Sequence, residues 1–167
     1  MENSVTMLQE AAESFIKALD KTEKELEKVD AKLREIRTKL EPMESEILDL
    51  SSKIREVEHA LHRKLNKVKR VRKLYLNAQT DRQMRTYEKE YNALMKDIHK
   101  LDKQLHELKE AYEKKVREEE KLLKKEFELE EKKAELYHER EALVKRAQSI
   151  VKMLQTKIER RSTTERL

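Results

Sequence analysis

From Val5 to Leu61, apolar residues recur at alternating intervals of three and four. The series is Val5, Leu8, Ala12, Phe15, Leu19, Thr22, Leu26, Val29, Leu33, Ile36, Leu40, Met43, Ile47, Leu50, Ile54, Val57 and Leu61, and Thr22 is its one polar member. An average interval of 3.5 residues keeps one seam of a helix against a partner helix. The pattern predicts a coiled-coil helix over residues 1–76, with a less apolar seam beyond Leu61.

A second apolar series follows, out of phase with the first. Its members are Met84, Tyr87, Tyr91, Leu94, Ile98, Leu101, Leu105, Leu108 and Tyr112. We therefore predict a second coiled-coil helix over residues 81–160, separated from the first by a turn or a register break at 77–80. Thr80 and Gln83 have the spacing of a capping box, and Asn77 suits the left-handed conformation that ends many helices. The alternative is a register slip within one continuous helix.

These features predict an all-α fold, a long coiled coil folded as an antiparallel hairpin with its turn near 77–80. Such a hairpin pairs residues whose numbers sum to about 157, so that Leu61 lies near Leu94 and Ile98. With Val5 at the a position of the heptad, the a positions of the first helix are mostly Leu and the d positions are rich in Val and Ile. Parallel dimers prefer Val or Ile at a and Leu at d, so the sequence disfavours a parallel dimer. Further assembly into a dimer or a hetero-bundle is expected.

Pro42 interrupts the first helix, and its ring predicts a kink there. The alternative is a reversal at Pro42 that would give three helices. Residues 113–141 form a charge-dense segment in which 20 of the 29 residues are Asp, Glu, Lys or Arg. Residues 161–167 lack apolar spacing and are expected to form a flexible tail.

The seam is expected to thin over this charge-dense segment and to recover beyond it. The predicted seam residues of the second helix in this part are Val116, Leu123, Phe127, Ala134, Tyr137, Val144, Ala147, Val151, Leu154 and Ile158.

Composition narrows the function classes. The chain is 45% charged and 37% hydrophobic, with no Gly or Cys. The sequence shows no apolar run near the roughly 20 residues of a membrane span and no secretory signal, so we expect a cytoplasmic protein without a transmembrane segment. It shows no nucleophile motif, Gly-rich phosphate loop or paired-carboxylate pocket, which predicts a non-enzymatic protein with no cofactor and no small-molecule substrate. Its histidines are read as surface residues rather than metal ligands; they are His59, His62, His99, His106 and His138.

Positive charge is concentrated before the predicted turn. No acidic residue occurs between His59 and Thr80, and this stretch holds the residues of a predicted basic patch: Arg63, Lys64, Lys67, Lys69, Arg70, Arg72 and Lys73. Such a patch can bind a polyanion, for example an acidic protein surface such as tubulin's tail, an anionic membrane or a nucleic acid. Nucleic acid is the weakest of these because no recognition motif accompanies the charge. The competing interpretation is an ordinary solvated helix face.

The leading functional hypothesis is a structural subunit or adaptor that binds itself or other coiled-coil chains in a larger, cytoskeletal complex. The predicted partner-binding seam comprises Leu26, Leu33, Ile36, Leu40, Ile47, Leu50, Ile54, Val57, Leu61, Leu94, Ile98, Leu101, Leu105 and Leu108. The alternative hypothesis is a polyanion-binding module that uses residues 63–73.

Overall fold

The protein is an all-α antiparallel helical hairpin, which confirms the predicted fold class. A computed structural model describes residues 2–166, and the side chains of residues 4–162. Helix α1 spans Glu2–Leu76 and helix α2 spans Asp81–Arg166. A connection at residues 77–80 joins them, so the chain turns rather than slipping register within one helix.

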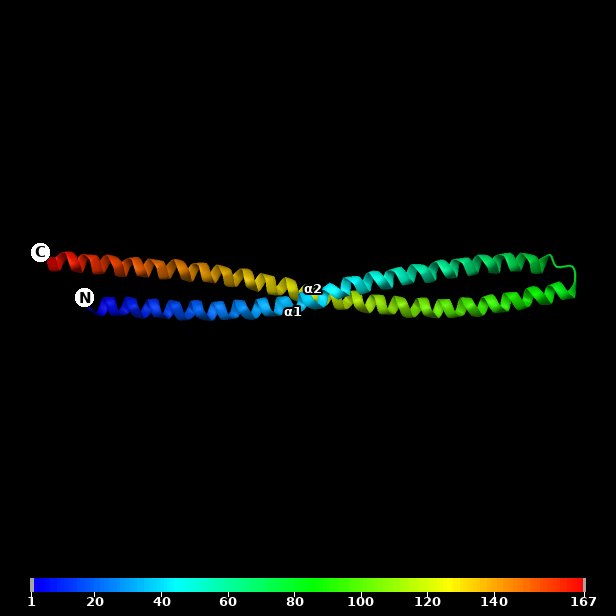
Figure 1. Ribbon diagram of the computed structural model, residues 1–167, viewed down its shortest axis with the longest axis horizontal. Helices are drawn as coiled ribbons and strands as arrows, with labels where there is room; N and C mark the ends of the chain where they lie inside the picture. The colour runs from blue at the N-terminus through cyan, green and yellow to red at the C-terminus, as the bar shows by residue number, and fades with distance from the viewer. Residues whose placement is uncertain (1, 167) are drawn as a thin grey trace. The chain divides into compact units, whose positions relative to one another are not determined.

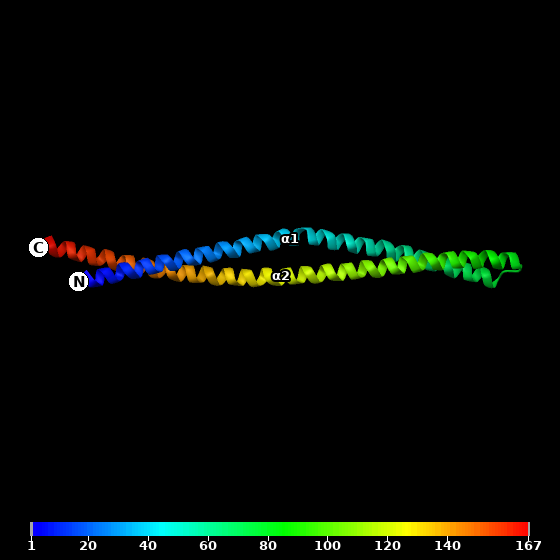
Figure 2. The same cartoon turned by 90° about the horizontal axis from the view of Figure 1, so that it is seen from below.

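The two helices pack in two compact units. The tip unit comprises Lys39–Leu122 and contains the turn, and the terminal unit holds the residues up to Thr38 and those from Leu123 onward. In each unit a stretch of α1 lies beside a stretch of α2, as both views show (Figure 1 and Figure 2). Neither helix contains, within the described residues, a stretch that is long and apolar enough to cross a bilayer.

Burial in α1 follows the apolar series read from the sequence. Each position of the series from Val5 to Leu61 is buried or half-buried, and the residues between them are mostly exposed. The most buried cluster belongs to the terminal unit, where Leu26, Val29 and Leu33 of α1 pack with Leu136 of α2. Buried apolar side chains at 3.5-residue spacing therefore supply the main cohesion of the hairpin.

Helix α1 remains continuous through Pro42, so the chain does not reverse there and the three-helix alternative is wrong. The kink expected at Pro42 stays a prediction. Helix α2 continues past residue 160, where the sequence pattern predicted its end, to Arg166. No Gly or Pro occurs in this last stretch, and nothing else in its sequence stops a helix. The flexibility predicted for residues 161–167 also stays a prediction.

The seam of α2 keeps one phase from the tip unit into the terminal unit, which differs from the prediction. Of the residues predicted there, Leu123, Phe127, Ala134, Tyr137, Val144, Val151 and Ile158 are exposed. The residues that are buried or half-buried are instead Leu122, Glu126, Leu129, Lys133, Leu136, Leu143, Ala147, Ile150 and Leu154.

These positions extend the phase of the run from Met84 to Tyr112 without interruption. Moving to the predicted positions would require α2 to rotate by one residue, or about 100°, against α1. The regular apolar run before the segment therefore sets the phase within it, although it brings charged residues into the seam.

Cross-helix polar contacts define the register between α1 and α2. In the tip unit they are Lys64–Asp97 at 3.1 Å, Lys109–Glu58 at 3.7 Å and Lys115–Glu46 at 2.7 Å. In the terminal unit they are Arg37–Glu130 at 2.9 Å, Lys133–Asp30 at 2.7 Å and Lys157–Ser4 at 3.0 Å.

The partners' numbers sum to 161–167 in both units, so the predicted pairing at about 157 is wrong by about one heptad. The first residues of α2 extend beyond the end of α1, which produces the offset (Figure 1).

Leu33 is the most deeply buried residue of the seam, at 1% exposure. Replacing Leu33 with Ala should lower the free energy of unfolding by about 2–5 kcal/mol, because the truncation loses transfer free energy and leaves a cavity. Urea unfolding followed by circular dichroism measures this difference. The matched control is Leu48→Ala, since Leu48 is 69% exposed and its loss should change stability by less than about 0.5 kcal/mol. Equal losses in the two variants would contradict the seam assignment.

Lys133 occupies a seam position of α2 and contacts the Asp30 carboxylate of α1. The hydrogen bond to Asp30 raises the pKa of Lys133 above its ordinary value of 10.5, because it favours the charged ammonium. A raised lysine pKa stabilises the fold fully below the unfolded-state pKa, and this contribution is lost as the pH rises through the folded-state pKa. The stability difference between the wild type and Lys133→Ala should therefore be constant near neutral pH and shrink above pH 10.5. Thermal unfolding across this range tests the prediction, and a difference that grows with pH would contradict it.

Candidate functional site at the hairpin tip

The hairpin turns without any residue in the left-handed conformation. No described residue has a positive φ, so the left-handed geometry expected of Asn77 is wrong. Helix α1 instead ends in two backbone hydrogen bonds: Asn77 N–H donates to the Lys73 carbonyl at 3.1 Å, and Ala78 N–H donates to the Tyr75 carbonyl at 3.2 Å. A tightened last turn satisfies carbonyl groups that a helix end leaves without partners, so glycine is not needed.

Side chains cap the start of α2. Gln83 N–H donates to the Thr80 hydroxyl at 3.2 Å, the first half of the predicted capping box. The Gln83 side-chain oxygen accepts from Gln79 N–H at 3.1 Å, one residue before the usual partner. Asp81 lies in the first turn of α2, where a negative charge is favoured by the helix dipole. These contacts hold both helix ends and so position the side chains of the tip.

The predicted basic patch lies on the last four turns of α1. Its members are exposed except Lys64, which is half-buried and contacts Asp97 of α2. Among the side chains that the structure describes, no ion pair involves the other six members of the patch. Their charge is therefore directed to solvent rather than used within the hairpin.

The start of α2 adds basic residues that the sequence pattern did not single out. Arg82, Arg85 and Lys89 are exposed there. Residues 63–96, the basic tip, contain eleven Lys and Arg residues and three Asp and Glu residues. The rest of the chain contains 29 basic and 32 acidic residues, so the net charge of +5 arises at the tip. Counting charge on both arms of the predicted turn would have found this contribution.

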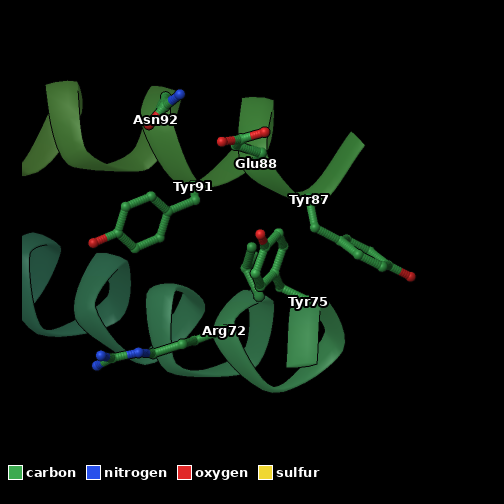
Figure 3. A pocket seen from close by; sticks show the side chains of 7 residues that line it. Arg72, Tyr75, Tyr87, Glu88, Tyr91 and Asn92 are labelled. Carbon is green, nitrogen blue, oxygen red and sulfur yellow. The ribbon is translucent and has the colours of Figure 1, made fainter. Parts of the chain in front are cut away.

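Tyrosines line a hollow of about 290 Å³ in the tip unit, together with Val71, Arg72, Glu88 and Asn92. The rings of Tyr75 and Tyr91 lie between the two helices (Figure 3), and Tyr87, which also lines the hollow, is half-buried. Tyr75 and Tyr91 are 39% and 38% exposed, so they form an open hollow. The tip thus combines basic side chains with accessible aromatic surface.

The exposed apolar surface continues to the end of the turn. Leu76 is 75% exposed and Met84 is 38% exposed, and they lie on either side of the four-residue connection. Large apolar side chains at the most accessible end of a helix pair are common in protein-binding surfaces.

The histidines do not converge. His59 and His62 line a second shallow hollow with Glu56 and Arg63. In the part of the chain whose side chains are described, no three potential metal ligands lie together.

The predicted partner-binding seam is buried or half-buried in the hairpin, covered by the helices of the chain itself. Its buried members are Leu26, Leu33, Ile36, Val57, Leu94, Ile98 and Leu105. Its half-buried members are Leu40, Ile47, Leu50, Ile54, Leu61, Leu101 and Leu108. Binding of another chain through these residues stays a prediction.

Comparison with known proteins extends the description of the fold. No protein-family model matches the sequence, and no curated protein matches it significantly. The structure is similar to that of the HP0958 protein from Helicobacter pylori, with a TM-score of 0.64 and 19% sequence identity. The similarity covers 93% of this chain and 68% of the HP0958 chain. At this identity it shows a shared helical hairpin fold and nothing of function.

The Thr80 cap should contribute measurably to the order of the tip. Replacing Thr80 with Ala leaves the Gln83 N–H without its side-chain acceptor and should destabilise the first turn of α2 by about 1 kcal/mol. Amide hydrogen exchange at residues 81–85 measures the effect. The control is Thr86→Ala, whose hydroxyl donates to the Arg82 carbonyl within the helix and whose loss should be close to neutral. Unchanged exchange in Thr80→Ala would rule out a role for the cap.

Proposed function

We propose that the protein is a non-enzymatic structural subunit that presents its basic tip to an acidic surface of a partner protein. The concentration of the net positive charge in residues 63–96 carries this proposal. The hairpin holds basic side chains of both helices at the turn, where charges from both arms act on the same ligand. Like charges held this close repel one another, and an acidic partner relieves that repulsion.

The apolar surface of the tip suits a protein partner. Leu76 and Met84 flank the turn, and the hollow bounded by Tyr75 and Tyr91 lies beside it. A peptide with aliphatic or aromatic residues among its carboxylates can fill that hollow while its charges reach the surrounding Lys and Arg residues. An anionic membrane could also bury these apolar side chains, so the binding experiment includes liposomes and oligonucleotides.

The expected setting is a cytoplasmic, cytoskeletal assembly, in which the acidic tail of tubulin is one partner of the required chemistry. The coiled coil would set the distance between this contact and further subunits. The proposed role is non-enzymatic because the sequence shows no nucleophile motif, phosphate-binding loop or paired-carboxylate pocket.

Reversing Lys69, Arg70 and Arg72 to Glu should abolish binding to a fluorescent glutamate-rich peptide and to microtubules. The three side chains are exposed, so the helical content should not change. Fluorescence anisotropy and co-sedimentation measure the two interactions. Wild-type affinity should fall as salt is raised from about 50 mM to 200 mM, since screening weakens exposed charge pairs.

The matched control reverses three exposed lysines outside the basic tip, Lys114, Lys121 and Lys125, to Glu. This control changes the total charge by the same amount and should retain binding. Equal loss in both variants would indicate a net-charge effect and contradict a localised site. Binding confined to anionic liposomes or oligonucleotides would replace the acidic-protein proposal with the polyanion alternative.

A further inference from the structure

The terminal unit leaves an apolar stripe of α2 uncovered. The stripe consists of Leu123, Phe127, Ala134, Tyr137, Val144, Val151 and Ile158. Exposure of its large members runs from 36% for Val144 to 63% for Phe127. The stripe lies next to the seam that contacts α1, one residue further along α2, and its apolar members remain exposed while the seam is covered.

The spacing of the stripe identifies a helix as its occupant. With Glu130, Glu141, Gln148 and Gln155 in the intervening positions, the stripe repeats at alternating steps of three and four from residue 123 to residue 158. This is the period of a coiled-coil seam, so the stripe fits a second long helix better than a short apolar ligand. Scattered surface hydrophobic residues would not maintain one phase over so many turns.

The charge along the stripe changes sign at its middle. Residues 124–141 contain seven Glu and five basic residues, whereas the equally long segment 144–161 contains six basic residues and one Glu. A second copy placed antiparallel sets the acidic half of each α2 against the basic half of the other. A parallel copy would set like charges together, which is unfavourable.

We infer that this stripe pairs with the same stripe of a second copy, forming an antiparallel coiled-coil dimer centred between Ala142 and Leu143. In this alignment Phe127 faces Ile158 of the second copy, and Ala134 faces Val151. The flanking Glu131 and Lys152, both exposed, lie close enough to form an ion pair between copies. Two-fold symmetry repeats each contact, so that both halves of the stripe are covered.

Sedimentation velocity over a micromolar concentration series tests the dimer. The wild type should show a concentration-dependent monomer–dimer equilibrium. Phe127→Ser and Ile158→Ser should each raise the dimer dissociation constant by more than about tenfold, because each substitution removes two symmetry-related apolar contacts. The control is Met153→Ser, which removes an apolar side chain that is 56% exposed but lies outside the stripe, and it should leave the equilibrium unchanged.

Circular dichroism should show the same helicity in all these variants, since none of the substituted residues is buried against α1. A wild type that stays monomeric throughout, or equal weakening by Met153→Ser, would overturn the inference.

Direction is tested separately by cross-linking, which the absence of native cysteine makes specific. Two populations, one with Ala134→Cys and one with Val151→Cys, are treated with a short bifunctional maleimide. The mixture should give a cross-linked dimer, and neither population alone should do so. Cross-linking within the single populations would indicate a parallel dimer and overturn the proposed alignment.

A charge exchange tests the same alignment in solution. Glu131→Lys alone and Lys152→Glu alone should weaken the dimer, and the double variant should restore it. Failure of the double variant to recover would contradict the antiparallel pairing. The tip variant with Lys69, Arg70 and Arg72 reversed should dimerise normally, so the dimer and the proposed acidic-partner function are tested independently.

Discussion

The hairpin depends on keeping a single apolar phase along each helix. An α-helix can present only one narrow face to its neighbour, so a residue's place in the repeat decides whether it is buried. In α1 this face is apolar along most of its length. In α2 the phase continues through the charge-dense segment, where Glu126 and Lys133 enter the seam while Phe127 remains exposed. The phase kept along the whole of α2 therefore decides which residues are buried, even where a larger apolar side chain lies one position away.

The same constraint explains how much the sequence could predict. The series of α1, the all-α hairpin and the turn after Leu76 could be read directly, because spacing and capping residues determine them. The seam of α2 beyond Tyr112 could not be chosen by hydrophobicity alone. Two adjacent phases both carry apolar residues there, and the exposed phase has the larger side chains, Phe127 and Tyr137.

The register and the properties of the tip also needed the structure. Sliding the helices by one heptad keeps apolar residues opposite one another, so the repeat alone allows both alignments. The observed alignment depends on how far α2 extends beyond α1 and on contacts such as Lys64–Asp97. At the tip, the basic residues of α1 were evident in the sequence. The exposure of Tyr75 and Tyr91 followed from where the two helices end.

Thr22 is a buried polar residue in the seam, and its hydroxyl donates to the Ala18 carbonyl of the same helix at 2.9 Å. A polar seam residue that needed a hydrogen-bond partner on the opposite helix would lose that bond whenever the helices paired in another register, which would make those registers less stable. Thr22 imposes no such penalty because its hydrogen bond moves with α1. Thr22 therefore adds nothing to axial alignment, which is set by the packing of the seam, by the cross-helix ion pairs, several of them half-buried, and by the turn. Added salt should therefore weaken the contribution of the exposed Lys109–Glu58 and Arg37–Glu130 pairs to alignment more than that of the half-buried Lys64–Asp97 and Lys133–Asp30 pairs.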